Sequence, residues 1–439
     1  MALHRKLGLF YIVMYGIGII VGAGVYALLG TAAGIAGNGL WISFAIGAIL
    51  ASFTGLSYAE LSSAYPKASA EANYLKHAFR KDWIAFAVGW LVAVVGFVSA
   101  GAVALGFAGY FSAFIPLPPV LVAIGLIFLL SIINFLGIET SAKFNAVFTV
   151  FEVIGVILII IVGIPFFGKV NYFELANGVP GIFSATALIF FAYIGFEAIA
   201  KLGEETKEAQ KMLPKALLLS IAITSILYIL LAISAVSIMP VSELSQTNAP
   251  LADLAAKAVS PGFGVIVAII ALLATFSTVL VILIVTSRLL YGLGQKHELP
   301  RIISRVHKKT GTPYIAIIAT AIGASAMALI GDIKIVADAT TFMIFLCFFA
   351  VNIALLDLRF HHKWYKPVFK APLNIGRFSI TAAIGAISSF AMLFSYTIME
   401  VQLTIVFVGT GMVIYLLEKH LEKANRKKTT VKKKWAARA

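Results

Sequence analysis

The chain has 439 residues, of which 61% are hydrophobic and only 12% are charged. This composition provides too little polar side chain to cover a water-exposed surface, so it excludes a soluble globular protein and indicates an integral membrane protein. The formal net charge of +15 would by itself be compatible with nucleic-acid binding. The distribution of the basic residues argues against a nucleic-acid partner.

Apolar runs predict an all-α protein with twelve membrane-spanning helices. Their ranges are 7–29, 40–59, 84–110, 117–136, 145–166, 180–200, 215–238, 261–293, 313–330, 335–356, 378–397 and 400–417. If both termini are cytoplasmic, every Lys and Arg falls in a cytoplasmic segment except Lys169, Lys257 and Lys334. This positive-inside bias predicts a multi-pass protein of the cytoplasmic membrane with both termini in the cytoplasm.

Several features limit the possible partners. Residues 419–439 form a basic tail, which we expect to be a solvated juxtamembrane segment that touches anionic membrane lipid. The first apolar run has no small-residue cleavage pattern after it, so we expect it to be retained rather than removed as a signal peptide. Cys347 is the single cysteine, and all seven histidines fall on predicted cytoplasmic loops or tails. The sequence therefore predicts no metal site within the membrane and no cofactor.

Glycines near the middle of the first apolar run predict an interrupted helix. Gly16, Gly18, Gly22 and Gly24 lie in this run, and each weakens a helix by about 1 kcal/mol relative to alanine. Opened backbone at membrane depth is tolerated only inside protein or beside a wet cavity, where the freed amides of the outer half-helix bind anions. The alternative is that Gly18 and Gly22 only allow close helix packing.

A second interruption is expected at Gly195, in the run 180–200. Runs one to five and six to ten then form two halves that each begin with a glycine-interrupted helix. Because each half has an odd number of spans, the second half is expected to insert upside down relative to the first, with a binding site at the midplane. The predicted units are listed in order: a first repeat at 1–167, a second repeat at 168–357, two peripheral spans at 358–418 and the tail at 419–439.

Two acidic residues are predicted at membrane depth, Glu152 and Glu197. Glu152 shares one helix face with Asn145 and Thr149, and a carboxylate at the centre of a membrane helix costs about 2.5 to 3.5 kcal/mol. We expect neither acid to have a basic partner, so each must be protonated, hydrated or opposite a bound cation, as in a coupling site. The alternative for Glu152 is a protonated, purely structural side chain.

Five motifs occur in an order that resembles the amino acid-polyamine-organocation transporters. They are Gly22-Ala23-Gly24-Val25-Tyr26; Tyr58-Ala59-Glu60-Leu61 with Tyr65-Pro66; the stretch from Phe190 to Glu197; Glu204-Glu205-Thr206 with Pro214-Lys215-Ala216; and Ser287-Arg288 through Glu298-Leu299-Pro300. The resemblance covers about the first 300 residues through these motifs and the remainder through topology alone. It implies the five-plus-five inverted repeat of LeuT-like transporters, with discontinuous helices 1 and 6.

The resemblance also implies that backbone groups of the two interrupted helices hold an amino acid. The implied binding residues are Ile20, Gly22, Ala23, Gly24, Val25, Phe191 and Ile194. By similarity, the amides of residues 23–25 bind the substrate carboxylate, and the carbonyls of Ile20, Phe191 and Ile194 bind the ammonium group. Phe191 aligns with the aromatic residue that closes over the substrate from outside, so we expect it to be a gate.

One departure from the family pattern concerns ion coupling. Relatives proposed to be proton-coupled often have a lysine where this chain has Glu152. Glu152 is therefore expected to bind a proton, or to bind a cation together with Ser277 or Thr278, and we add Glu197 to this coupling group. On a membrane helix, the hydroxyls of Ser277 and Thr278 are equally compatible with simple bonding to their own backbone.

The third predicted span lacks the additional acid often found in relatives that carry cationic amino acids. We therefore expect a proton-coupled secondary transporter of neutral, apolar amino acids that works by alternating access. Alternatives within the transport class are a sodium-coupled symporter and an exchanger of amino acids or amines. An integral-membrane enzyme is a remaining alternative, but such chemistry usually needs a nucleophile with its base, or clustered His, Asp and Cys residues.

Overall fold

The computed structural model describes residues 7–67, 70–136 and 142–436, with the side chains of 142–147, 204 and 421–436 excepted. These residues are almost entirely helical. Up to residue 166 the elements are α1 (Leu9–Val21), α2 (Ala23–Ala36), α3 (Leu40–Ala64), α4 (Ala70–Phe79), α5 (Asp82–Phe111), α6 (Pro119–Phe135), α7 (Ala142–Gly163) and the 3-10 turn η1 (Ile164–Phe166).

The remainder of the chain continues in the same way. Its elements are α8 (Gly178–Ile189), η2 (Phe190–Tyr193), α9 (Phe196–Ala200), η3 (Lys201–Glu204), α10 (Ala209–Ile238), α11 (Val241–Leu244), α12 (Pro250–Ala258), α13 (Pro261–Gln295), η4 (Arg301–Ser304), α14 (Tyr314–Ala328), α15 (Ile333–His361), α16 (Ile380–Met392), η5 (Leu393–Ser395) and α17 (Ile398–Ala436). Two short strands, β1 (Asn374–Ile375) and β2 (Phe378–Ser379), pair antiparallel between α15 and α16.

Within the described residues, nine helical stretches are long and apolar enough to cross a membrane. Three further apolar helices are shorter: α6, α14 and the pair α16 and η5. These three fall in the predicted runs 117–136, 313–330 and 378–397, so each of the twelve predicted runs contains an apolar helix. The structure therefore supports a multi-pass membrane protein, while the number of twelve crossings stays a prediction.

The first interruption lies at Gly22. Helix α1 ends at Val21 and α2 begins at Ala23, and between them Gly22 has φ −36° and ψ −156°, which is not helical. A side chain on Gly22 would meet the Thr278 hydroxyl, since an added Cβ would lie 2.7 Å from Thr278 Oγ1. The close approach of the Thr278 side chain on α13 therefore favours glycine at this break.

The second interruption follows α8, which ends at Ile189. The chain makes the 3-10 turn η2 and then reaches Gly195, where φ is +121° before α9 begins. This left-handed region of φ is accessible to glycine at little cost. A Cβ on Gly195 would also lie 2.2 Å from Ile19 Cγ2, so the second interruption presses directly against the first helix.

The two interrupted helices run antiparallel, and backbone hydrogen bonds join both pairs of ends. At one end, Leu7 N–H donates to Glu205 O at 3.1 Å, just before α1 and just after η3. At the other end, Ala176 N–H donates to Ala36 O at 3.3 Å, where α2 ends and α8 is about to begin. These contacts show that the two interrupted helices run in opposite directions with their ends aligned. The two breaks therefore meet at a similar depth in the protein.

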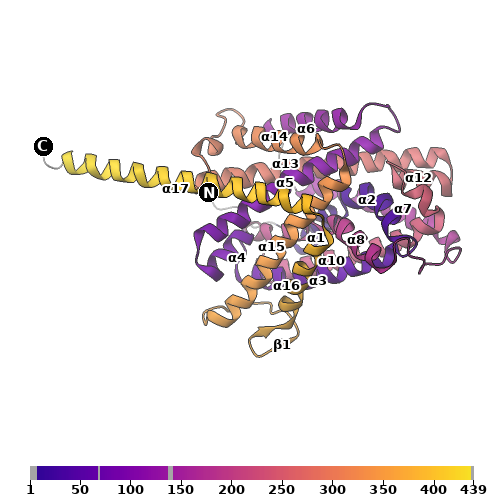
Figure 1. The fold of residues 1–439 in the computed structure, drawn as a ribbon, viewed down its shortest axis with the longest axis horizontal. Helices are drawn as coiled ribbons and strands as arrows, with labels where there is room; N and C mark the ends of the chain where they lie inside the picture. The colour runs from indigo at the N-terminus through magenta and orange to yellow at the C-terminus, as the bar shows by residue number, and fades with distance from the viewer. Residues whose placement is uncertain (1–6, 68–69, 137–141, 437–439) are drawn as a thin grey trace.

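The remaining helices enclose this pair to different extents. Within the most apolar window of each helix, 83% of the residues of α5 are buried, against 22% for the stretch Ile398–His420 of α17. Figure 1 shows α5 crossing the centre of the molecule, α6 and α14 along one edge, and α17 projecting from the body. The centre of the fold is therefore formed by the interrupted helices with α3, α5, α10, α13 and α15 around them.

The structure buries charged side chains beyond the two acids predicted at membrane depth, Glu152 and Glu197. Arg359, in α15, is 6% exposed and pairs with Glu60 of α3, which is fully buried. The Arg359 Nε–H donates to Glu60 Oε1 at 2.8 Å, and the Ala371 amide donates to Glu60 Oε2 at 2.7 Å. Asp338, also in α15, accepts a hydrogen bond from the Lys334 ammonium group at 2.8 Å. The pairing of Glu60 with Arg359 depends on which helices become neighbours in the folded chain, whereas Lys334 precedes Asp338 by only one helical turn.

Replacing Arg359 with Met should destabilise the protein strongly, because it leaves the Glu60 carboxylate buried without its counter-charge. The expected loss is about 3 to 5 kcal/mol of unfolding free energy, measured by thermal or chemical unfolding in detergent. The double variant Arg359→Met/Glu60→Gln should recover part of this loss. Arg377→Met removes an exposed arginine and should change little; equal losses in the two single variants would contradict the assignment.

Candidate functional site

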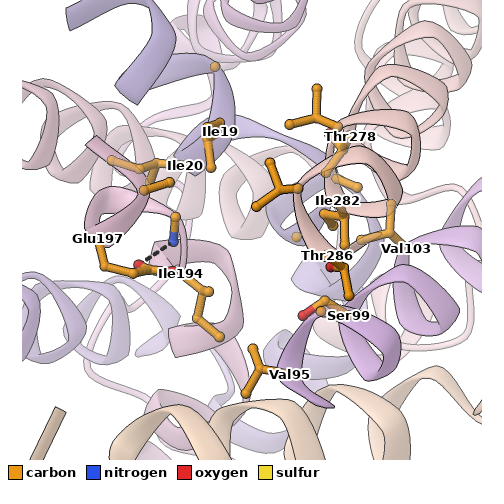
Figure 2. Close-up of a pocket in the computed structure, with 18 of the residues that line it drawn as sticks. Ile19, Ile20, Val95, Ser99, Val103, Ile194, Glu197, Thr278, Ile282 and Thr286 are labelled. Carbon is orange, nitrogen blue, oxygen red and sulfur yellow. Dashed lines mark hydrogen bonds between the residues drawn. The ribbon is translucent and has the colours of Figure 1, made fainter. Parts of the chain in front are cut away.

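A cavity lies between the two interruptions and the helices opposite them. Its walls come from α1, α2, η2 and α9 on one side and from α5 and α13 on the other, with Glu152 of α7 and Ile344 of α15 completing it. In Figure 2 the labelled residues of α1 and α9 lie across the cavity from those of α5 and α13. The cavity therefore lies next to the backbone of the two interruptions, where the helical hydrogen bonding is broken.

Most of the predicted binding residues line this cavity. They are Ile20, Ala23, Gly24, Phe191 and Ile194. Gly22 forms the break itself, and Val25 is buried behind the wall at 1% exposure; neither lines the cavity. The structure thus brings together residues that are about 170 positions apart in the sequence.

The first turn of α2 presents its backbone to the cavity. The first amides of an α-helix have no partner within the helix and carry its positive dipole end. Gly22 precedes this turn and provides no side-chain cap. A Cβ on Gly24 would lie 2.7 Å from the Cα of Ala192, so this position has no room for a side chain. The arrangement can bind a small anion without a charged residue.

Two of the three carbonyls predicted to accept an ammonium group, those of Ile20 and Phe191, already accept one hydrogen bond. Ile20 O accepts from the Tyr228 hydroxyl at 2.5 Å, and Phe191 O accepts from Ile194 N–H at 3.3 Å. A carbonyl has two acceptor positions, so both can accept a second bond. The Phe191 side chain is 8% exposed and lines the cavity.

Glu152 and Ser277, both predicted as coupling residues, are in contact. The Ser277 hydroxyl lies 2.8 Å from Glu152 Oε1, while Oε2 is buried and has no hydrogen-bond partner within the described part of the chain. Glu152 lines the cavity and is 3% exposed. An unpartnered carboxylate oxygen beside a cavity is suited to accept a proton or to coordinate a cation.

Some of the neighbouring hydroxyls bond to their own helix backbone, and others lie beside the cavity. Thr275 bonds only to backbone of its own helix, at Ala271 O and Leu272 O. Thr278 bonds to Ala274 O at 2.8 Å but also lines the cavity beside Gly22. Thr149 is buried against Gly18, where an added Cβ would lie 1.9 Å from Thr149 Oγ1. The Asn145 side chain lies outside the described residues.

Glu197 and a lysine that the sequence reasoning missed share one end of the cavity. Glu197 Oε2 accepts from Gly195 N–H at 2.8 Å, which ties the side chain to the second interruption. Lys201 lines the same cavity and pairs with Glu71 of α4 at 3.3 Å. Glu197 is expected to have no basic partner, and among the described residues no ion pair joins it to Lys201, although both side chains line the same cavity. Its spacing of four residues from Lys201, one helical turn, was a signal available in the sequence.

The cavity extends from the interruptions toward one membrane face. Val92 near the start of α5 and Leu289 near the end of α13 line it, and so does Val285, which is 36% exposed. On the opposite side the lining residues Ala23 and Val103 are buried, at 0% and 2% exposure. The cavity is therefore more open toward the face where α1 and α5 begin.

Few ionisable side chains line the cavity. Across the parts of the chain that the structure describes, no group of three or more His, Cys, Asp or Glu residues is arranged to hold a metal ion. The ionisable residues of the lining are Tyr15, Glu152, Glu197 and Lys201.

Comparison with known proteins gives a consistent family. A family model described as amino acid permease matches residues 7–417. The branched-chain amino acid permease BcaP of Bacillus subtilis is 34% identical over 250 residues, covering 52% of this chain and 54% of that protein. The methylthioribose transporter of Bacillus subtilis is 29% identical, with the same coverage. The chloroplastic cationic amino acid transporter 9 of Arabidopsis thaliana is also 29% identical, covering 44% of that protein. The chain spans about half the length of the curated relatives it matches.

Cysteine labelling can test the direction in which the cavity opens, because the only native cysteine, Cys347, is buried. Val285→Cys should react with a small water-soluble thiol reagent, since the side chain faces a hydrated cavity. Ile284→Cys, at a position that is 4% exposed, is the matched control and should react far more slowly. Labelling would be measured by mass spectrometry of the intact protein. An unreactive Val285→Cys would place this residue against lipid instead.

Proposed function

This chain belongs to the amino acid permease family, among the amino acid-polyamine-organocation transporters, and on that premise we propose that it is a secondary active transporter of neutral, apolar amino acids. The family consists of transporters, so the membrane-enzyme alternative has no support. The observation that carries the proposal is the meeting of two antiparallel interrupted helices at one cavity.

The proposed architecture has twelve crossings with an inverted repeat of five plus five. Residues 1–167 and 168–357 form the two repeats, 358–418 the peripheral spans and 419–439 the basic tail. The opposite directions of the two interrupted helices support this division, because an inverted repeat requires them. The protein is placed in the cytoplasmic membrane with both termini in the cytoplasm, as the positive-inside bias favours.

The substrate is held as a zwitterion at the two interruptions. The amides at the start of α2 bind its carboxylate, and the carbonyls of Ile20, Phe191 and Ile194 bind its ammonium group. Exposed backbone beside the cavity supports this assignment. Phe191 acts as the gate on the closed side, while substrate leaves toward Val285 and Leu289 on the open side.

A neutral, apolar side chain fits the cavity best. Apart from Ser99 and Thr286, the walls contributed by α5 and α13 between the interruptions and the open end are formed largely by aliphatic side chains, among them Val95, Ile282 and Val285. The similarity to a protein named as a branched-chain amino acid permease agrees with this preference.

Glu152 is the proposed coupling residue. Its free Oε2 accepts a proton when the cavity is open to one side and releases it when the cavity faces the other side. Sodium coupling through Glu152, Ser277 and Thr278 is the alternative, because these three residues place oxygens beside the first interruption. Exchange of amino acids or amines without net ion coupling is a second alternative.

Uptake into liposomes tests the function directly. Purified protein should accumulate labelled leucine, alanine or another neutral amino acid when a proton gradient is imposed. The full panel of twenty amino acids should be measured with a proton gradient and with a sodium gradient. If uptake persists without sodium, the sodium-coupled alternative is excluded. If no substrate shows gradient-stimulated uptake or exchange, the proposal is contradicted.

Glu152→Gln should uncouple transport from the gradient. The amide cannot carry the proton, so accumulation should fall about tenfold or more, equivalent to about 1.4 kcal/mol of coupling free energy. Substrate binding, measured by scintillation proximity, should largely remain. Glu174→Gln, which changes an acid remote from the cavity, serves as the control. Unchanged accumulation in Glu152→Gln would show that this residue is structural.

A further inference from the structure

A second groove lies on the outside of the molecule, between α6 and α14. These two helices pack against each other at one edge of the fold (Figure 1). None of the residues that line this groove also lines the cavity described above. The groove is therefore a separate feature of the lipid-facing surface.

The groove is lined mostly by apolar side chains, with Ser131 and Ser325 among them. On α14 it follows one helical stripe, from Tyr314 through Ile318 and Ile322 to Leu329. Ile322 and Leu329 are each 65% exposed, so no other part of the described chain covers them. At 1.5 Å per residue, the stripe from Tyr314 to Leu329 is about 22 Å long. That length exceeds the hydrocarbon depth of one leaflet, about 15 Å, so an acyl chain can lie along it.

One end of the groove is marked by a histidine between two of its lining residues. The His307 ring lies 5.1 Å from the Phe135 ring and 6.3 Å from the Tyr314 ring. The Thr312 hydroxyl donates to Phe135 O at 2.9 Å, which fixes the loop before α14 against the end of α6. The segment 301–313 therefore sits at this end of the groove.

This segment is basic and exposed. Arg305, Lys308 and Lys309 are all exposed, and none of them makes an ion pair with another described residue. Among the basic side chains of the segment 301–313, Ile302 and Val306 are 48% and 45% exposed. Alternating apolar and basic side chains are typical of a segment at the membrane interface, where cations meet headgroup phosphates.

We propose that the groove between α6 and α14 binds an anionic phospholipid, with one acyl chain along the helical stripe and its phosphate on Arg305, Lys308 and Lys309. We choose an anionic phospholipid because its negative charge complements these three basic side chains. An apolar helix of another protein would fill the groove but would leave three unpaired cations at its end. A zwitterionic lipid would provide the same chains with less compensation of charge.

Native mass spectrometry of the purified protein tests the site with phosphatidylglycerol and phosphatidylcholine of identical chains. The wild-type protein should bind phosphatidylglycerol more tightly. Lys308→Gln/Lys309→Gln should weaken phosphatidylglycerol binding roughly 30-fold, given the contribution of each basic residue at a membrane surface, and should leave phosphatidylcholine binding unchanged. Lys363→Gln/Lys366→Gln removes two exposed lysines from another loop and should have no effect.

A substitution that fills the groove tests whether an acyl chain lies in it. Ala321→Trp should weaken binding of both lipids, whereas Leu121→Trp, at a 65% exposed position of α6 outside the groove, should not. Three results would overturn the proposal: equal affinity for the two lipids, equal effects of the two lysine pairs, or displacement of the lipid by inorganic phosphate alone. A change of oligomeric state in Ala321→Trp without a change in lipid binding would also overturn it, in favour of a second copy of the chain.

Discussion

The hydroxyl of Tyr228 in α10 lies against both interruptions at once, 2.5 Å from Ile20 O and 3.0 Å from Ala192 O. Backbone carbonyls that lose their helical partners inside a membrane cost several kcal/mol each unless another donor replaces the partner. Tyr228 is fully buried, and its one hydroxyl proton is shared between the two carbonyls, so it supplies a donor where water is scarce. The two breaks can therefore persist side by side, and the cavity between them depends on this contact.

The same scarcity of water explains why most charged side chains around the cavity are paired or hydrogen-bonded. Glu197 is held by the amide of Gly195, itself freed by the second interruption, and Lys201 one turn later is paired with Glu71. Glu152 differs, because only one of its carboxylate oxygens has a partner among the described residues. A partly satisfied acid beside a cavity can change protonation or ligation as the surroundings change, which a fully paired acid does less readily.

The interruptions could be predicted from the sequence because glycine is conspicuous in a long apolar run, and the family motifs assigned to them the residues predicted to bind substrate. The acids were harder to judge. Glu60 resembles an ordinary loop residue in the sequence, yet it is buried with Arg359, which follows it by 299 residues. Asp338 lies inside a predicted span but was passed over, although Lys334 one turn earlier was a local signal. Long-range pairs leave no such signal, since burial depends on which helices become neighbours.

The sequence alone determined the class of the protein, the apolar helices and the two glycine breaks, because hydropathy and backbone conformational freedom are local properties. Tertiary structure decided which residues face the cavity. It set Val25 behind the wall, placed Ser277 on Glu152 and brought Lys201 to the open end. It also left the groove between α6 and α14 uncovered. These outcomes depend on how helices distant in the chain pack together, which the period and composition of a single helix do not specify.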